Sequence, residues 1–156
     1  MNTPLYTSIK RILDKESIEY EEAQHEPVYT SDMAGDVSGH ANEEGTKSLV
    51  LELGTGGLAV VTVTGGDRVD FKLIKKVLRE KKITMCQSGV LSGQLGTEIG
   101  GVAPFGYGAN VKLVVSPKLF RQKNVYFNAG RNDVTIKVSG QDFQKAMALC
   151  GAIVLE

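Results

Sequence analysis

The sequence predicts a single mixed α/β domain, spanning residues 1–156, in which helices are interleaved with strand pairs. The chain has 156 residues, of which 42% are hydrophobic, and this is enough for one domain with an ordinary core. Helical and strand periodicities alternate along the chain. Because short glycine turns join several of the strands, those pairs should be antiparallel. The combination favours a mixed sheet over a doubly wound parallel one.

The first part of the chain should open with an amphipathic helix. Thr3-Pro4 has the form of an N-cap followed by a first helical residue, and apolar residues recur at helical spacing over 4–16. A short strand is expected over 20–24. Thr30 or Ser31 can cap a short helix, and the polar residues 35–45 should form an exposed loop.

The rest of the chain alternates between strand and helix patterns. Residues 48–53 and 58–64 are typical of paired strands joined by the turn at 54–57. An amphipathic basic helix follows Asp67, with its apolar stripe from Val69 to Leu78. The remaining predicted elements are strands over 83–86, 111–115, 125–128, 134–138 and 153–155, and helices over 88–95, from Ser116-Pro117, and over 140–150 after the cap Ser139.

Composition excludes some classes of protein. No apolar run approaches the roughly 18 residues of a membrane span, and the N-terminus has no signal-peptide pattern. Cys86 and Cys150 are far apart in apolar segments, so a reduced, cytoplasmic protein is the simplest interpretation, although a disulfide is possible.

Charge is distributed unevenly along the chain. Residues 1–60 hold 11 acidic and 4 basic residues, whereas residues 61–156 hold 7 acidic and 14 basic ones. Such asymmetry is compatible with contact to a polyanion through one face. The candidate contacts are on the basic helix: Lys72, Lys75, Lys76 and Arg79. A solvated helix face is the more common explanation of such a run.

Two segments carry candidate chemistry. Residues 96–106 are rich in glycine around Pro104-Phe105-Gly106, which predicts a shaped loop that presents backbone groups to another molecule. Lys47 lies at a loop-to-strand junction, where it could hold a phosphate or polarise a carbonyl, or simply be a surface lysine. The surrounding glycines do not have phosphate-loop spacing.

Other reaction classes lack support. His25 and His40 have no paired ligands at metal-binding spacing, so no metal and no cofactor are predicted. No Gly-x-Ser-x-Gly elbow is present, and neither cysteine has a nucleophile signature.

The ordered landmarks resemble the YbaK family, also called the prolyl-tRNA synthetase insertion-domain family, which comprises freestanding aminoacyl-tRNA deacylases. The resemblance runs from about His25 to the C-terminus. The matching segments are residues 25–30, 47–51, 66–71, 100–106, 127–130 and 139–143. It implies a mixed, mostly antiparallel, partly barrel-like β-sheet surrounded by helices. It also implies a role in translation fidelity, in which the protein hydrolyses the ester that joins a wrong amino acid to tRNA.

The resemblance further implies the site and the partners. Gly100 and Gly101 would offer backbone groups near the scissile carbonyl, and Lys47 would hold the terminal adenosine or the ester. A neighbouring ribose hydroxyl would assist proton transfer, so no cofactor is needed. The partners would be the acceptor end of an aminoacyl-tRNA and a synthetase, with no membrane. The implied substrate-binding residues are Tyr29, Thr30, Ser31, Pro104, Phe105, Asn128 and Gly130.

Departures from the family pattern leave alternatives open. Some members place serine where Asn128 aligns and aspartate where Thr135 aligns. A non-catalytic module of the same fold, binding tRNA or a synthetase, is therefore the first alternative. Hydrolysis of another small acyl ester or amide is the second. Neither the edited amino acid nor the oligomeric state can be inferred from the sequence.

Overall fold

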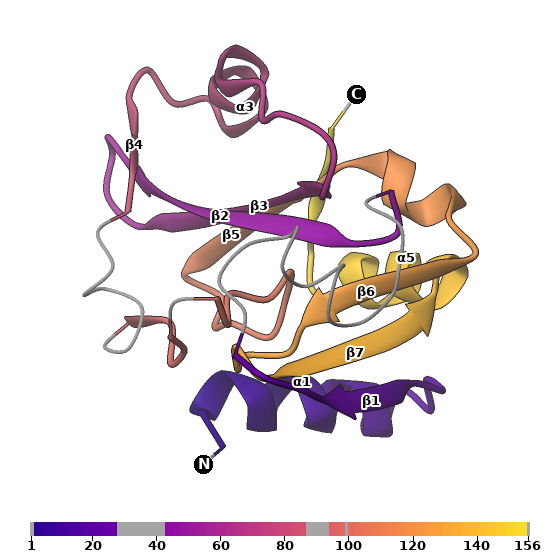
Figure 1. Ribbon diagram of the computed structural model, residues 1–156. Helices are drawn as coiled ribbons and strands as arrows, with labels where there is room; N and C mark the ends of the chain where they lie inside the picture. The colour runs from indigo at the N-terminus through magenta and orange to yellow at the C-terminus, as the bar shows by residue number, and fades with distance from the viewer. Residues whose placement is uncertain (1, 28–42, 87–93, 99, 156) are drawn as a thin grey trace.

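The computed structural model describes residues 2–27, 43–86, 94–98 and 100–155, and in this part of the chain two β-sheets are combined with helices (Figure 1). The elements in chain order are α1 (Pro4–Lys15), β1 (Glu21–Gln24), β2 (Thr46–Leu53), β3 (Leu58–Thr64), α3 (Phe71–Leu78), β4 (Ile83–Met85), β5 (Val111–Val115), the 3₁₀ helix η1 (Pro117–Arg121), β6 (Asn124–Asn128), β7 (Val134–Ser139), α5 (Gly140–Leu149) and β8 (Ile153–Val154).

The local sequence signals identify most of these elements correctly. The Thr3 side chain accepts a hydrogen bond from the Tyr6 N–H at the start of α1, and Ser139 does the same for Asp142 at the start of α5. The segment after Ser116-Pro117 is a short 3₁₀ helix. The predicted short helix after Thr30 lies outside the described residues, as does most of the predicted helix over 88–95.

The strands form two sheets, of which one is mixed and the other is antiparallel throughout. One contains five strands in the order β4-β2-β3-β5-β8, and the other contains three in the order β1-β7-β6. Pairing is antiparallel except between β3 and β5 and between β5 and β8. A parallel bridge between Gly45 and Tyr126 joins the two sheets. The expected partial barrel is therefore two sheets connected at one corner.

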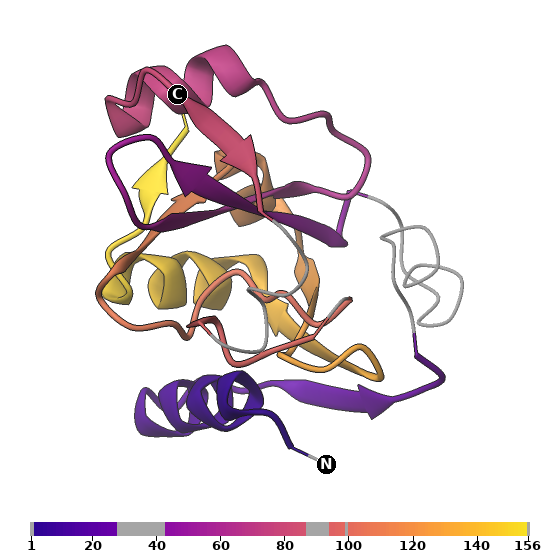
Figure 2. The same cartoon turned by 90° about the vertical axis from the view of Figure 1, so that its left-hand side faces the viewer.

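The helices cover the sheets in layers. α3 packs on the face of the five-stranded sheet that points away from β6 and β7, where Ile74 meets Leu51 and Val61 (Figure 1). On the other side, α5 lies between this sheet and α1 (Figure 2). A larger core fills that space and includes Ile9 of α1 and Phe143 of α5. Burial of these apolar faces supplies the main stabilisation of the fold.

Two composition-based expectations can be compared with the structure. None of the helices in the described part of the chain is long and apolar enough to cross a bilayer. In the described part of the chain, Cys86 and Cys150 are half-buried thiols, and neither forms a disulfide. Burial raises the pKa of each thiol, so both are weak nucleophiles near neutral pH.

Candidate functional site

The glycine-rich loop is held against helix α1. The Leu5 N–H donates to the Gly96 carbonyl at 3.1 Å, and the Ser8 hydroxyl donates to the Gly106 carbonyl at 2.6 Å. Gly106 has a φ of +109°, and a Cβ there would be 2.8 Å from Cγ1 of Ile9. Part of the glycine content is thus explained by close packing on α1 rather than by presentation to a ligand.

Gly130 occupies a similar packing position. Its φ is +84°, and a Cβ there would be 2.5 Å from the backbone nitrogen of Tyr6. Its carbonyl accepts hydrogen bonds from the hydroxyls of Thr3 at 2.6 Å and Thr97 at 2.9 Å. Gly130 is therefore a buried junction between α1, the glycine-rich loop and the end of β6. Its predicted place beside the substrate stays a prediction.

Asn128 and Gly100 are brought into direct contact. The Asn128 side-chain amide, at the end of β6, donates to the Gly100 carbonyl. Gly100 has a φ of +82°. The Gly101 N–H donates to the Glu98 carbonyl at 2.8 Å, so that donor is used within the loop. Among the described residues, the Gly100 N–H donates to no group. Of the two predicted backbone contributors, Gly100 has the available donor.

Pro104 and Phe105 lie inside the protein. Phe105 is fully buried, with its ring centroid 5.5 Å from that of Phe127. Beside them, the Tyr107 hydroxyl accepts from the Ala103 N–H and donates to the Ala103 carbonyl. Burial raises the pKa of Tyr107, so it stays protonated and supports the loop. The Phe105 side chain belongs to the core, whereas its predicted substrate contact stays untested.

Lys47 has a different partner from the one expected. It lies opposite Val63, which belongs to the α3-covered core, and its ammonium donates to the Asp67 carbonyl. The Asp67 carboxylate also pairs with Lys118 at 3.2 Å. No hydrogen bond in the described part of the chain joins Lys47 to Gly100 or Asn128.

The backbone nevertheless places Lys47 at the same end of the molecule as Asn128. The bridge between Gly45 and Tyr126 is parallel, so both chains run in one direction from it. Lys47 is two residues beyond Gly45, and Asn128 is two residues beyond Tyr126. The common direction brings the two residues to one end of the molecule, although Lys47 shares the sheet face of Val63, which α3 covers.

His25 lies close to Asn128, and the sequence gives it no role in the predicted site. Its Nε2 lies 2.7 Å from the Thr135 hydroxyl, and its Nδ1 lies 2.7 Å from the Glu26 carbonyl. Thr135 is buried and lies directly opposite Asn128 on one side and Ala23 on the other. Residues opposite one another on antiparallel strands share a sheet face. His25, Thr135 and Asn128 therefore belong to one polar row that the local sequence does not reveal.

The turn beside this row is stabilised by an ion pair. Arg131 Nε and Nη2 each lie 2.8 Å from a carboxylate oxygen of Asp133. The arginine lowers the pKa of Asp133. The Asp133 carbonyl accepts from the His25 N–H at 2.9 Å, which connects the ion-paired turn to the histidine.

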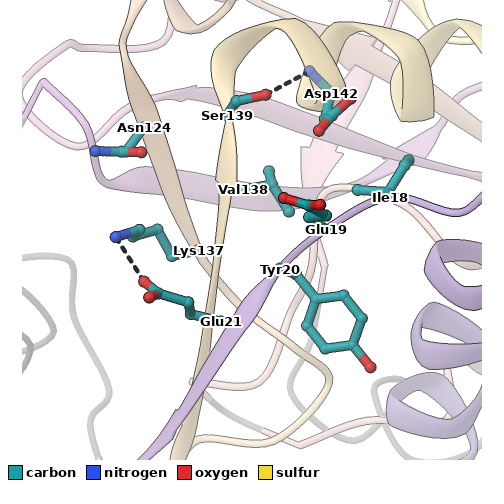
Figure 3. A pocket seen from close by; sticks show the side chains of 9 residues that line it. All are labelled: Ile18, Glu19, Tyr20, Glu21, Asn124, Lys137, Val138, Ser139 and Asp142. Carbon is teal, nitrogen blue, oxygen red and sulfur yellow. Dashed lines mark hydrogen bonds and ion pairs between the residues drawn. The ribbon is translucent and has the colours of Figure 1, made fainter.

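Two cavities lie along the three-stranded sheet. The smaller, of about 240 Å³, is lined by Glu21, Glu22, Ala23, Tyr126, Thr135 and Lys137. The larger, of about 620 Å³, extends toward the start of α5 (Figure 3). Lys137 and Glu21 point toward one another there and form an ion pair at 2.5 Å. The two cavities share this pair, so they are adjacent parts of one polar surface.

The remaining predicted residues lie elsewhere. Lys72, Lys75 and Lys76 belong to α3, and Arg79 caps its C-terminus. Lys75 is half-buried, and the other three are exposed. α3 covers the side of the five-stranded sheet opposite to β6 and β7 (Figure 1). These cations are therefore separated from Asn128 by the sheet. Tyr29, Thr30 and Ser31 lie outside the described residues.

Comparison with known proteins identifies the family. Residues 25–146 match the family model of the aminoacyl-tRNA editing domain. The chain belongs to this family. The multifunctional Ser/Thr-tRNA deacylase ProXp-y of Escherichia coli K12 is 24% identical over 136 residues, covering 85% of this chain and 81% of the deacylase.

Solved structures of other proteins show the same fold. A candidate trans-editing enzyme for prolyl-tRNA synthetase superposes with a TM-score of 0.78 at 19% identity, covering 99% of this chain and 96% of that one. A hypothetical protein of known crystal structure gives a TM-score of 0.82 at 22% identity, with 94% and 96% coverage. The expected YbaK-like fold is thereby confirmed.

Proposed function

We propose that Asn128 and Gly100 form the hydrolytic site of this trans-editing aminoacyl-tRNA deacylase. The observation that carries the proposal is the hydrogen bond from the Asn128 amide to the Gly100 carbonyl. It fixes the orientation of a glycine whose own N–H is uncommitted in the described part of the chain. A fixed backbone N–H is the kind of donor that stabilises the oxyanion formed when water attacks an ester.

The reaction needs few protein groups. A water oxygen attacks the ester carbonyl carbon, the carbonyl oxygen gains negative charge, and the bond to the ribose oxygen breaks. The ribose oxygen takes up a proton, which yields a free amino acid and a tRNA with an intact terminal ribose. The neighbouring ribose hydroxyl can relay that proton. Gly100 would stabilise the oxyanion, and Asn128 would hold Gly100 in position.

Serine and threonine are the first amino acids to test. The Escherichia coli relative is named for deacylation of Ser- and Thr-tRNA. In this chain the polar row of Thr135 and Asn128 suits a small, polar aminoacyl group better than a large apolar one. Editing supplies discrimination between small side chains that a single binding site cannot reach.

Lys47 is proposed to contact the acceptor end. Its ammonium is at present held by the Asp67 carbonyl, which orients it and leaves its positive charge uncancelled by that neutral group. Lys47→Ala should raise the KM for aminoacyl-tRNA more than it lowers kcat, because phosphate contacts act mainly on binding. Lys112→Ala, which removes an exposed lysine of β5, is the control. An unchanged KM in Lys47→Ala would remove this role.

The decisive experiment uses a panel of mischarged tRNAs. The wild-type protein is incubated with tRNAs that are mischarged with serine or threonine, among them Ser-tRNA(Ala), and with Cys-tRNA(Pro) and Ala-tRNA(Pro). Release of the amino acid is followed. We expect hydrolysis above the spontaneous rate for at least one of the acylated tRNAs. No acceleration with any of them would contradict the proposal. Binding without turnover would instead favour a non-catalytic module of this fold.

A further inference from the structure

Three segments of the chain meet at the end of β3. Ser116, which caps η1, donates its N–H to the Thr62 carbonyl of β3 at 2.9 Å. Lys47 of β2 lies opposite Val63, the next residue of β3. Asp67 follows β3, and its carbonyl accepts from the Lys47 ammonium. The start of β2, the loop after β3 and η1, which is the orange helical turn between β5 and β6 in Figure 1, therefore share one corner of the five-stranded sheet.

η1 presents two cations on a firmly packed support. Lys118 and Arg121 are exposed, whereas Leu119 is fully buried in the core. The Phe120 ring lies against Phe143 of α5, with the ring centroids 6.2 Å apart. In a 3₁₀ helix, side chains three residues apart lie one above the other, about 6 Å apart along the axis. Lys118 and Arg121 are therefore held side by side along one edge of η1.

Positive charge prevails at this corner. Residues 116–124 contain three cations and no carboxylate. Asp67 pairs with Lys118 at 3.2 Å, although the Lys118 side chain is still 59% exposed. Arg121 forms no ion pair within the described part of the chain. The next carboxylate along the loop, that of Asp70, accepts from N–H groups at the start of α3. The corner is thus open to a polyanion.

We propose that the basic corner, formed by Lys47, Lys118 and Arg121, binds the phosphate backbone of the acceptor stem of the tRNA. This inference rests on the proposed function, in which Lys47 contacts the acceptor end. A tRNA acceptor arm is a duplex stem continued by a single-stranded 3′ end, so a cation at the 3′ end should be followed by cations along the stem. Lys118 and Arg121 meet that requirement, because Lys118 pairs with the same Asp67 whose carbonyl holds Lys47.

Binding of uncharged RNA tests this surface without any hydrolysis. The probe is an RNA hairpin that consists of an acceptor stem and its single-stranded 3′ end, and fluorescence anisotropy gives its Kd at several salt concentrations. Each phosphate contact contributes about 0.7–0.9 to the slope of log Kd against log salt concentration. Lys118→Ala and Arg121→Ala should each lower the slope by this amount. Wild-type slopes in both variants would overturn the inference.

Asp67→Asn gives a prediction of the opposite sign. The substitution removes the carboxylate that pairs with Lys118, while the backbone carbonyl that holds Lys47 remains. The Kd for the hairpin should fall by up to about fivefold, the upper end of the range for an exposed charge pair. Damage to the fold would weaken binding, so tighter binding isolates the electrostatic role. Unchanged or weaker binding by a folded Asp67→Asn protein would contradict the inference.

Matched cations on α1 provide the controls. Arg11 and Lys15 are exposed on this helix, which lies below β6 and β7, away from the five-stranded sheet (Figure 1). Arg11→Ala and Lys15→Ala should keep the wild-type Kd and slope. If they lowered the slope as much as Arg121→Ala, RNA would be attracted to the cations of the protein in general, and the assignment to the basic corner would be wrong.

Hydrolysis of seryl-tRNA, measured in parallel, tests the proposed function separately. The hairpin can bind through the basic corner when no hydrolysis is observed, which would contradict the proposed function alone. Hydrolysis can also be observed while every variant keeps the wild-type slope, which would contradict only the basic corner.

Discussion

Gly130→Ala should destabilise the protein strongly, because an added methyl group meets the backbone of α1. The new Cβ would be 2.5 Å from the nitrogen of Tyr6, a distance that the backbone can relieve only by moving the start of the helix. Overpacking of this kind costs about 1–3 kcal/mol. The φ of +84° adds about 1–2 kcal/mol for any residue with a side chain.

The sum, about 2–5 kcal/mol, is a large share of the roughly 5–15 kcal/mol that keeps a protein folded. Equilibrium unfolding in urea, followed by circular dichroism, measures the loss. Gly151→Ala and Gly56→Ala are controls, because these glycines also have positive φ but no atom within 4 Å of an added Cβ. The free energy of unfolding of each control should fall by only about 1–2 kcal/mol.

The difference between Gly130→Ala and its controls isolates the contact with α1. If Gly130→Ala were no less stable than Gly151→Ala, the packing explanation would be wrong. If Gly130→Ala kept full stability and yet lost deacylation, Gly130 would instead border the substrate, as the family resemblance implies.

Further predictions concern the ion pair and the basic surfaces. Arg131 holds the pKa of Asp133 below its ordinary value, which is near 4. The ion pair therefore stabilises the fold at pH values above about 4, and this stabilisation is lost as the pH falls through the lowered pKa. Asp133→Asn should therefore lower the free energy of unfolding by about 1 kcal/mol at pH 7, and the difference from wild type should vanish near pH 2 in urea titrations. Lys118→Glu should raise the KM for aminoacyl-tRNA, since Lys118 shares Asp67 with the proposed acceptor-end lysine. Lys76→Glu, on α3, should change the KM by less than about twofold in the same steady-state assay, and a larger change would place tRNA on that helix.

Local sequence signals are sufficient for most elements. Thr3-Pro4 marks the start of α1, and Ser139 marks the start of α5, because a cap needs only a side chain a few residues from the N–H groups that it satisfies. The β2–β3 hairpin is predicted by its alternation and its glycine turn. The segment after Ser116 is a 3₁₀ helix over only Pro117–Arg121, a distinction that the cap alone does not make.

The site is less predictable because its contacts are non-local. Gly100 and Asn128 are identified through the family resemblance, but the hydrogen bond between them joins residues 28 positions apart. His25 and Thr135 are 110 positions apart and meet only because β1 pairs with β7. The sequence and the family resemblance associate the glycines at 106 and 130 with a ligand, whereas the structure gives each a contact with α1 that no local pattern encodes.

The most direct test of the central claim is the single-turnover rate of serine release from Ser-tRNA by the wild-type protein and by Asn128→Ala. The account predicts that the wild-type protein accelerates release and that Asn128→Ala is slower by about 10²–10³-fold, the cost of misplacing one oxyanion donor. The variant should stay folded, because a lost hydrogen bond costs only about 1 kcal/mol. Release by a folded Asn128→Ala protein at the wild-type rate would contradict the account.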